Sequence, residues 1–413
     1  MTGPRRFDAR RGWAMPSSRA PDFEPSQAAA HARLEAVRPA DYARTRNHLG
    51  GAVSRLSPYI THGMLTLPEV YRAVDGRHRI GPQHKFTYEL GWREFFHHQW
   101  SRLGDGIFAS LRGGPLPDDA YSDELPADLI EARTGLPVID RAVEALYATG
   151  WLHNHARMWL ASYTVHLRKV HWRAGADWMY GHLLDGDLAS NHLSWQWVAG
   201  TASHKPYLFN AENVARYAPP EWHAPGTVID CSYEDLDRIA RDPSFVGEAG
   251  GPSGAGRIAK AGLGADVGGG GKTDGQGIEQ PSFAATPPVE IAPAEPDALV
   301  GHWLIHPWAI RPSPAGRSAI GVLYAPFHRR WPWSERRWRF VLTAMAEVCE
   351  RIVWCEAIAP VGLDALVETT GDPHLGMGAF ASASARHPRL FDWPARDCRS
   401  FSEFWRLTRL VQV

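Results

Sequence analysis

A serine-containing turn beside an arginine is the first feature of the sequence that could do chemistry. Ser54, Arg55, Leu56 and Ser57 are followed directly by Pro58. Ser57 is suited to cap a helix that has Pro58 in its first turn, which leaves free backbone N–H groups and two hydroxyls beside a cation. Such a helix start binds phosphate well. The same five residues also fit an ordinary capped helix with no ligand.

A second group lies at helical spacing further along the chain. Glu89, Trp92, Arg93 and Phe96 share one face of a predicted helix. A carboxylate, an indole and a guanidinium placed together suit a pocket that stacks an aromatic ligand and hydrogen-bonds its edge. The alternative is a surface ion pair between Glu89 and Arg93.

A third group combines an amide, a thioether and a cation. Asn154 and Met158 fall on one face of a predicted helix, with Arg157 beside them. Asp185 and Asp187 follow, and their carboxylates could pair with Arg157 or with a sugar hydroxyl.

The segment around Asp187 has two interpretations. Asn191, four residues further on, could bring its amide to a ligand ring. Without a ligand, Asp187 would simply cap the helix that follows.

Tryptophan is the extreme entry in the composition, with 18 among 413 residues. Trp195 and Trp197 stand two apart on a predicted helix and therefore point to opposite sides. Trp172 is predicted to end the preceding long helix, where it could lie near Trp195. Each indole alone fits a core position, whereas a spaced series also suits electron hopping.

The elements that position these residues are mainly helical. Three- and four-residue apolar periodicity predicts an all-helical domain at 26–246 after a basic flexible tail at 1–25. Composition predicts a disordered Gly/Pro-rich linker at 247–297. A βαβ rhythm predicts a small α/β domain at 298–413. The fold class is therefore mostly α.

Bulk properties exclude several classes of protein. Lys and Arg (44) nearly balance Asp and Glu (45), so any nucleic-acid contact must use a local basic surface. Four cysteines far apart in sequence fit neither a disulfide scaffold nor a CxxC metal site, and no metal is expected. Because the sequence has no membrane-spanning apolar run and no signal peptide, we expect a monomer in the reduced cytoplasm without membrane contact.

Together the motifs resemble the FAD-binding domain of DNA photolyases and cryptochromes. The matching segments are SRLSPYITHG, ELGWREF, TGLPVIDRAVEALYATGWLHNHARM and HWRAGADWMYGHLLDGDLASNHLSWQW, in the family's order and spacing. They cover about residues 40 to 215, roughly half of the chain.

The resemblance implies a bent, U-shaped FAD and a set of residues that hold it. The family's diphosphate loop matches Ser54, Arg55, Leu56 and Ser57, with Tyr42 as an upstream contact. Arg157 would pair with Asp185. The residues implied to contact the flavin are Arg93, Asn154, Asp187 and Asn191.

The resemblance also implies a DNA substrate. The family's residues for a flipped-out pyrimidine dimer match Glu89, Trp92, Asn154, Met158 and Trp197, all with the type found in enzymes that repair cyclobutane dimers. Photoexcited reduced flavin would pass an electron to the dimer, and the carboxyl group of Glu89 would stabilise the dimer's radical anion. Flavin would be re-reduced through Trp195 and then Trp172.

The sequence departs from the family pattern in several places. Tyr121 lies where a third, surface tryptophan is common, so the relay ends at Tyr121 or elsewhere. Val53 and Phe86 replace the usual Thr and Trp near the cofactor. No α/β antenna domain precedes the helical domain, while the segment from about 297 faintly resembles that domain in a new position. Its antenna chromophore is unknown, and an unrelated α/β module is the alternative.

Three functions remain open from the sequence. The intact dimer-binding residues favour light-dependent repair of DNA by a deoxyribodipyrimidine photolyase. The missing outer tryptophan and the altered domain order favour a cryptochrome-like blue-light receptor. A flavoprotein that has lost both roles would keep most of the same motifs.

Overall fold

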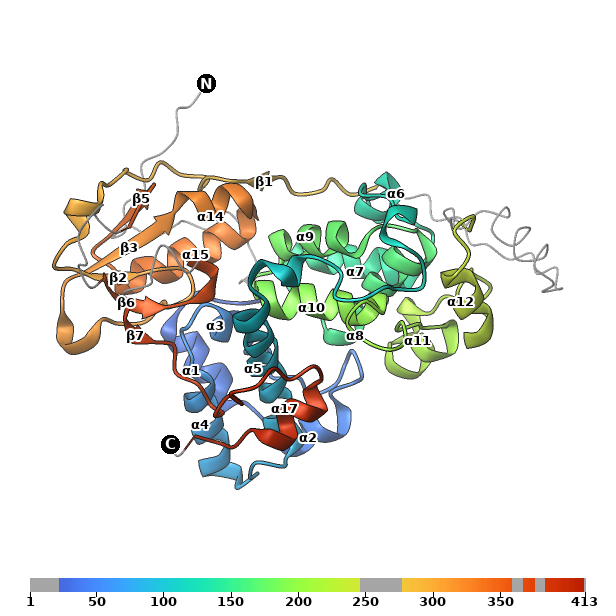
Figure 1. Ribbon diagram of the computed structural model, residues 1–413, viewed down its shortest axis with the longest axis horizontal. Helices are drawn as coiled ribbons and strands as arrows, with labels where there is room; N and C mark the ends of the chain where they lie inside the picture. Colours follow the sequence, from blue (N-terminus) through green and yellow to red (C-terminus); the bar gives the residue numbers. More distant parts are fainter. Residues whose placement is uncertain (1–21, 246–276, 359–366, 376–382, 412–413) are drawn as a thin grey trace.

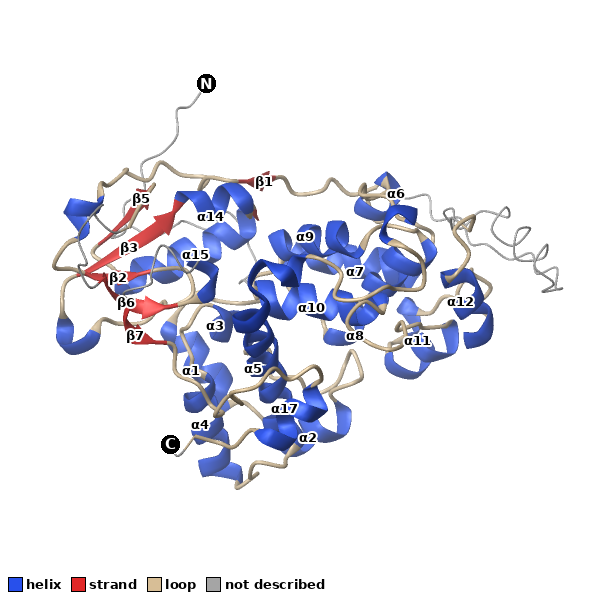
Figure 2. Cartoon of the chain, in the orientation of Figure 1, coloured by secondary structure: helices blue, strands red, loops and turns tan. Residues whose placement is uncertain are grey.

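The computed structural model describes residues 22–245, 277–358, 367–375 and 383–411. In these ranges a helical part comes first in the chain and a smaller part with a parallel sheet follows it (Figures 1 and 2). The mostly helical fold predicted from periodicity and the α/β character of the C-terminal part are both present. No helix in the described ranges has the length and apolar character needed to cross a bilayer.

The helical part has helix ends that its sequence specifies locally. A capping box between Thr66 and Glu69 starts the fourth helix, and Gly150, at φ 69°, ends the seventh in a left-handed turn. The α-helices are α1 (Gln27–Glu35), α2 (Pro39–Thr45), α3 (Ser57–Thr61), α4 (Leu67–His78), α5 (Lys85–Leu103), α6 (Ala127–Ile130), α7 (Pro137–Thr149), α8 (Asn154–Ser162), α9 (Trp172–His182), α10 (Leu188–Ala199), α11 (Ala211–Tyr217) and α12 (Tyr233–Ala240). The short helical turns are η1 (Gly104–Phe108), η2 (Asp118–Ala120), η3 (Tyr163–Leu167) and η4 (Pro220–Trp222).

The long helix predicted from Asn154 to Trp172 is in fact broken. α8 passes into the π-helical turn η3, and the chain then reverses through Lys169 at φ 52°. The ammonium of Lys169 is buried and donates to backbone carbonyls of His166 and Ile239 at 2.7 Å each. Because this tertiary contact holds the break, Trp172 begins α9 instead of ending the preceding helix.

The C-terminal part contains an open sheet in which all strands are parallel. Its order is β5-β3-β2-β6-β7, so the strand order reverses between β2 and β6. The strands are β2 (Trp303–Ile305), β3 (Ala319–Tyr324), β5 (Arg351–Cys355), β6 (Val367–Gly371) and β7 (Ala383–Arg386), and the helical elements are η5 (Pro296–Leu299), η6 (Pro314–Gly316), α14 (Ala325–Arg330), α15 (Glu335–Val348), η7 (Pro373–Leu375) and α17 (Phe401–Leu407). β3 is buried over most of its length, as expected of a central parallel strand.

The described end of the predicted linker is ordered. β1 (Phe283–Ala284) pairs with β4 (Trp333–Ser334), and the N–H of Ile278 donates to the carbonyl of Glu131 at 3.0 Å. Composition could not reveal these long-range contacts. Most of the predicted tail and residues 247–276 of the predicted linker lie outside the described residues.

The last residues return to the helical part instead of completing the α/β domain. In Figure 1 the red helix α17 lies beside α5. The buried carboxylate of Glu94 on α5 accepts hydrogen bonds from the Leu390 backbone N–H at 2.6 Å and from the Trp393 indole at 2.5 Å. The predicted domain at 298–413 therefore divides between the sheet and the surface of α5.

The two parts meet along a contact that we call the domain seam, formed by Trp331, Arg337 and His374 against α9 and α10. The guanidinium of Arg337 is fully buried and donates to the carbonyls of Tyr180 at 2.8 Å and Gly186 at 2.6 Å. A Cβ added at Gly186 would lie 2.4 Å from this guanidinium, so the close approach requires glycine.

Candidate functional site

Residues from distant segments of the helical part surround a polar cavity of about 390 Å³, here called the inner cavity. The turn before α3, α5, α8 and the start of α10 all contribute to it. The predicted site residues that line it are Tyr42, Ser54, Arg55, Ser57, Glu89, Arg93, Asn154, Arg157, Met158, Asp185, Asp187, Asn191 and Trp195. The structure thus brings together most of the residues that the sequence singled out.

The pairing predicted for Arg157 is present. Its guanidinium lies 2.7 and 3.0 Å from the two carboxylate oxygens of Asp185. The side chain of Asp185 is only 4% exposed, so removing the cation would leave a buried charge without its partner. This pair joins α8 to the loop before α10.

Asp187 both caps a helix and forms the centre of a charged cluster. Its Oδ1 accepts from the backbone N–H of Ser190 at 2.7 Å, as the capping interpretation predicts. Its Oδ2 lies 2.8 Å from His97, 3.4 Å from Arg93 and 3.7 Å from His374. Burial alone would raise the pKa of Asp187, but the charges of His97 and Arg93 hold it well below its usual range. The same carboxylate raises the pKa of His97 against the effect of burial.

The serine turn differs in detail from the prediction. α3 begins at Ser57 itself, and Leu56, which precedes it, is helical in its backbone and buried in the core. The hydroxyl of Ser57 accepts from the Trp151 indole at 3.2 Å, so its proton remains available to a ligand. Arg55 has φ 51° and lies over the ring of Trp151 at 4.8 Å. A non-glycine residue in this region is a costly conformation that occurs often at binding sites.

Glu89 and Arg93 do not pair with each other. Glu89 instead lies 3.2 Å from Arg46 and 2.9 Å from Lys85. The expected contact between Asn154 and Met158 is present, with the amide nitrogen 3.3 Å from the thioether sulfur. Glu89, Asn154 and Met158 thus form one polar wall of the inner cavity.

Trp92 and Trp197 lie outside the set of residues that line the inner cavity. Phe401 of α17 stacks on Trp92 with ring centroids 4.0 Å apart and planes at 11°. Trp197 is 39% exposed and packs beside Tyr207. Sequence patterns could not predict that α17 would cover one face of Trp92, because the two are more than three hundred residues apart.

Trp195 and Trp172 are both buried, at 2% exposure, on the adjacent helices α10 and α9. The ring of Trp195 packs so tightly on Gly175 that an added Cβ there would lie 2.3 Å from it. Gly175 follows Trp172 by one helical turn. Trp195 and Trp197 face opposite sides of α10, as their spacing predicts.

Several residues of the site were missed from the sequence. Arg46 lines the inner cavity, and His97 and His374 reach Asp187. His97 lies one turn beyond Arg93 on α5, so the helical spacing could have suggested it. His374 belongs to the C-terminal part, and nothing local in the sequence connects it with Asp187.

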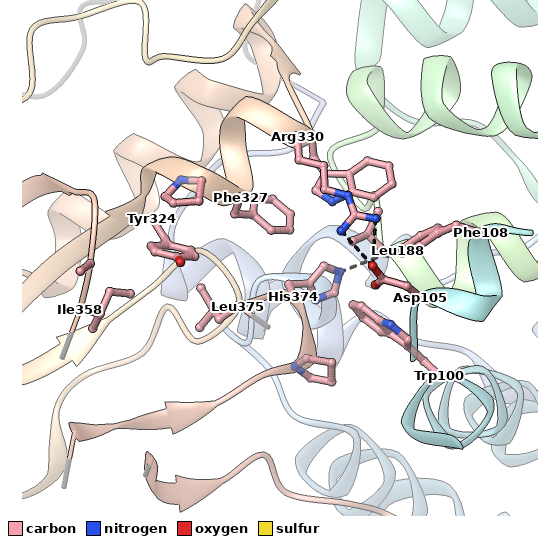
Figure 3. Close-up of a pocket in the computed structure, with 14 residues that line it drawn as sticks. Trp100, Asp105, Phe108, Leu188, Tyr324, Phe327, Arg330, Ile358, His374 and Leu375 are labelled. Carbon is pink, nitrogen blue, oxygen red and sulfur yellow. Dashed lines mark hydrogen bonds and ion pairs between the residues drawn. The ribbon is translucent and has the colours of Figure 1, made fainter. Parts of the chain in front are cut away.

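A second cavity of about 500 Å³, the outer cavity, opens at the domain seam where β3, β5 and β6 end. Figure 3 shows Trp100 and His374 on one side, Tyr324 and Phe327 on another, and Arg330 joined to Asp105. The Arg330–Asp105 pair is 3.1 Å long and bridges the two parts of the chain. In open α/β sheets, ligands commonly bind in the crevice outside the carboxyl ends of the strands.

Part of this chain is similar to known proteins. Residues 86–221 match the family model described as the FAD binding domain of DNA photolyase. A deoxyribodipyrimidine photo-lyase of Streptomyces griseus is 37% identical over 169 residues, covering 40% of this chain and 36% of the relative. A cryptochrome DASH of Gloeobacter violaceus is 32% identical, covering 39% of this chain and 34% of the relative. A crystal structure of a Synechocystis cryptochrome has a TM-score of 0.43 at 28% identity, with 48% of this chain and 44% of that chain covered.

Residues 86–221 are thus similar to the FAD binding domain of DNA photolyase, and part of the chain is similar to a curated photo-lyase and a cryptochrome DASH. The chain spans only about a third of the length of each of these two curated relatives.

The inner cavity fits FAD chemically. Hydroxyls and a cation lie at the serine turn, as a diphosphate requires, while carboxylates and an amide lie near Asp187, where a flavin ring edge could be hydrogen-bonded. The hydroxyl of Ser190, which also lines the cavity, is buried and has no hydrogen-bond partner among the described residues. A buried unpaired hydroxyl in a polar cavity is consistent with a ligand that supplies its partner.

Proposed function

We propose that this protein binds FAD in the inner cavity and uses it to repair cyclobutane pyrimidine dimers in DNA under blue light, as a deoxyribodipyrimidine photolyase. The observation that carries the proposal is the wall formed by Glu89, Asn154 and Met158, which adjoins the serine turn and the Asp187 cluster in one cavity. The resemblance to the photolyase family implies that all three residues have the type expected in enzymes that repair cyclobutane dimers.

The cofactor would be held at two ends. Ser54, Arg55 and Ser57 would bind the diphosphate, with Tyr42 close by, and Asp187 and Asn191 would hydrogen-bond the flavin. Arg93 and the Arg157–Asp185 pair would fix the orientation of that second end. When bound and reduced, FAD supplies the light-excited electron donor.

Glu89 in the inner cavity and two tryptophans outside it would act on DNA. Base flipping costs a few kcal/mol and least for a damaged, already distorted pair. Glu89, held by Arg46 and Lys85 at the cavity wall, would hydrogen-bond the dimer and stabilise its radical anion. Trp197 is exposed and free to stack, whereas Trp92 could offer only the ring face that Phe401 leaves open.

The test is repair of an oligonucleotide containing one thymine dimer by protein that has been chemically reduced beforehand. We expect recovery of thymine absorbance under blue light and its loss in Glu89→Ala, with Glu144→Ala, an exposed glutamate on α7, as the matched control. Bound, reduced FAD without repair in the natural protein would contradict the proposal.

A cryptochrome-like receptor is the second candidate. It is favoured by the Phe401 stack on Trp92, which ties the C-terminal segment to the face predicted to bind DNA. A light-dependent change in protection of residues 390–411 from hydrogen exchange, with no dimer repair, would support this candidate.

We also propose that the C-terminal part is an antenna-type domain. The supporting observation is the aromatic lining of the outer cavity at the carboxyl ends of its strands. Purification of the protein with a second chromophore, and its loss in Phe327→Ala, would test this assignment.

A further inference from the structure

The helical part alone does not show which residue donates the next electron to Trp172. Two aromatic paths lead away from its ring. One passes through His171, at 5.6 Å, to Tyr121, whose ring lies 6.3 Å from His171. The other passes through His192, at 6.4 Å, to Trp331, whose ring lies 5.5 Å from His192.

We propose that Trp331, from the C-terminal part, is the outer member of the tryptophan relay that re-reduces the flavin. This inference rests on the proposed function, since it requires FAD in the inner cavity and electron transfer through Trp195 and Trp172. It assigns the last step of the relay to the domain seam.

The chemistry of the two end residues favours Trp331. A phenol must lose its proton when it is oxidised, and burial raises the pKa of Tyr121 to about 12. Within the described ranges no carboxylate or imidazole accepts a hydrogen bond from the Tyr121 hydroxyl. An indole can give up an electron first and its proton afterwards, so Trp331 needs no base in place.

A carboxylate beside His192 also favours this path, while burial lowers the pKa of the His192 imidazole and so favours its neutral form. Its Nε2 lies 2.8 Å from the carboxylate of Asp177, which also binds Arg173 at 2.7 Å. This partly exposed carboxylate contacts His192, whose ring lies between the two indoles, and stabilises an electron hole that passes from Trp172 to Trp331.

Two guanidiniums over Trp331 would then make the transfer hard to reverse. Arg173 and Arg330 lie 5.1 and 5.3 Å from its ring centroid, and each is paired with a carboxylate, Asp177 at 2.7 Å and Asp105 at 3.1 Å. Cations beside an oxidised indole favour loss of its N–H proton, because the neutral radical carries no charge next to them.

The position of Trp331 suits a terminal donor. It is 5% exposed and lines the outer cavity, so a small reductant can approach it from solvent. In the full series of reaction steps, Trp331 gives one electron to the Trp172 radical cation and releases its indole proton to water. A thiol in solution then returns a hydrogen atom to the neutral Trp331 radical, and two thiyl radicals combine to a disulfide.

The experiment is flash photolysis of the full chain with oxidised FAD bound, together with the yield of reduced flavin in continuous blue light with a thiol. We expect the long-lived absorption of the neutral tryptophan radical to be lost in Trp331→Phe, with a lower yield of reduced flavin. Trp354→Phe, in the same part of the chain but away from His192, is the matched control and should behave as the natural protein does.

A second variant guards against a packing effect. Trp331→Tyr keeps an oxidisable ring at this place, so the radical signal detected by electron paramagnetic resonance should change from tryptophan to tyrosine. An unchanged tryptophan radical in both Trp331 variants would overturn the proposal, as would loss of the long-lived radical in Tyr121→Phe alone.

Failure of the proposed light-driven electron transfer would give a different experimental result. Natural protein that binds FAD but forms no radical at all under light would contradict light-driven electron transfer as a whole. A radical that forms normally but does not depend on Trp331 would contradict only the assignment of Trp331.

Discussion

The inner cavity and the domain seam are both buried and both contain arginine, yet they are built in opposite ways. The inner cavity draws on residues 42–198, and its cations face carboxylates, as Arg157 faces Asp185. At the seam, Arg337 faces two backbone carbonyls and the rings of Tyr180 and Trp333 at 4.5 and 4.2 Å. A cation held by carbonyls and rings fixes the loop around Gly186 without neutralising the nearby Asp185 and Asp187. Arg337 therefore positions the loop of the cavity without forming an ion pair with its carboxylates.

The largest effect should come from breaking the charge pair inside the cavity. Arg157→Met leaves the buried carboxylate of Asp185 unpaired, which should lower the free energy of unfolding by about 3–5 kcal/mol and abolish FAD binding. Denaturant unfolding and flavin absorbance of the purified protein measure the two effects. Arg141→Met, an arginine on the outer side of α7, is the control; equal losses in both variants would contradict the role of the pair.

A smaller loss should follow at the seam. Arg337→Met leaves the carbonyls of Tyr180 and Gly186 without a donor, at a cost of about 3 kcal/mol if each loses 1–2 kcal/mol. FAD affinity should fall as well, because Gly186 lies between Asp185 and Asp187. Stability lost with unchanged FAD affinity, measured by titration, would show that the seam does not position the cavity.

Replacement of His97, which contacts Asp187, should change the free energy of unfolding by about 1–2 kcal/mol, and the size of this change should depend on pH. Because the pKa of Asp187 is depressed in the folded protein, its carboxylate stabilises the fold at pH values above the ordinary aspartate pKa. This stabilisation is lost as the pH falls through the folded-state pKa. Because the pKa of His97 is raised in the folded protein, its protonated imidazole stabilises the fold at pH values below the ordinary histidine pKa. This stabilisation is lost as the pH rises through the folded-state pKa of His97. His97→Gln should therefore cost most between about pH 4 and 6.5 and less above that range. A pH-independent difference in thermal stability between the two proteins would contradict this pairing.

The smallest effect on stability is expected outside both regions. Trp197→Ala removes an exposed ring and should change the free energy of unfolding by less than about 1 kcal/mol. FAD should remain bound, while affinity for dimer-containing DNA should fall, as measured by fluorescence anisotropy. Loss of flavin in this variant would contradict the assignment of Trp197 to DNA.

Much of the inner cavity was predictable because its information is local. Helical spacing placed Asn154 beside Met158, and the carboxylate of Asp187 caps α10 as its position before that helix suggested. The parallel sheet could be predicted from the βαβ rhythm. The pairing of Glu89 with Arg46 could not, because Arg46 reaches it from the end of α2, although the other partner, Lys85, lies one turn away on α5. Its neighbour Arg93 turns toward Asp187.

The sequence by itself determined which residue types could bind a dinucleotide and which helices would carry them, because caps, glycine turns and apolar spacing act within a few residues. Only the tertiary structure decided what the C-terminal part contributes. The stack of Phe401 on Trp92, the insertion of Arg337 beside Gly186 and the approach of Trp331 to His192 all join residues more than one hundred positions apart. Such contacts depend on how whole elements pack, and hydrophobic packing is non-directional, so no local pattern encodes them.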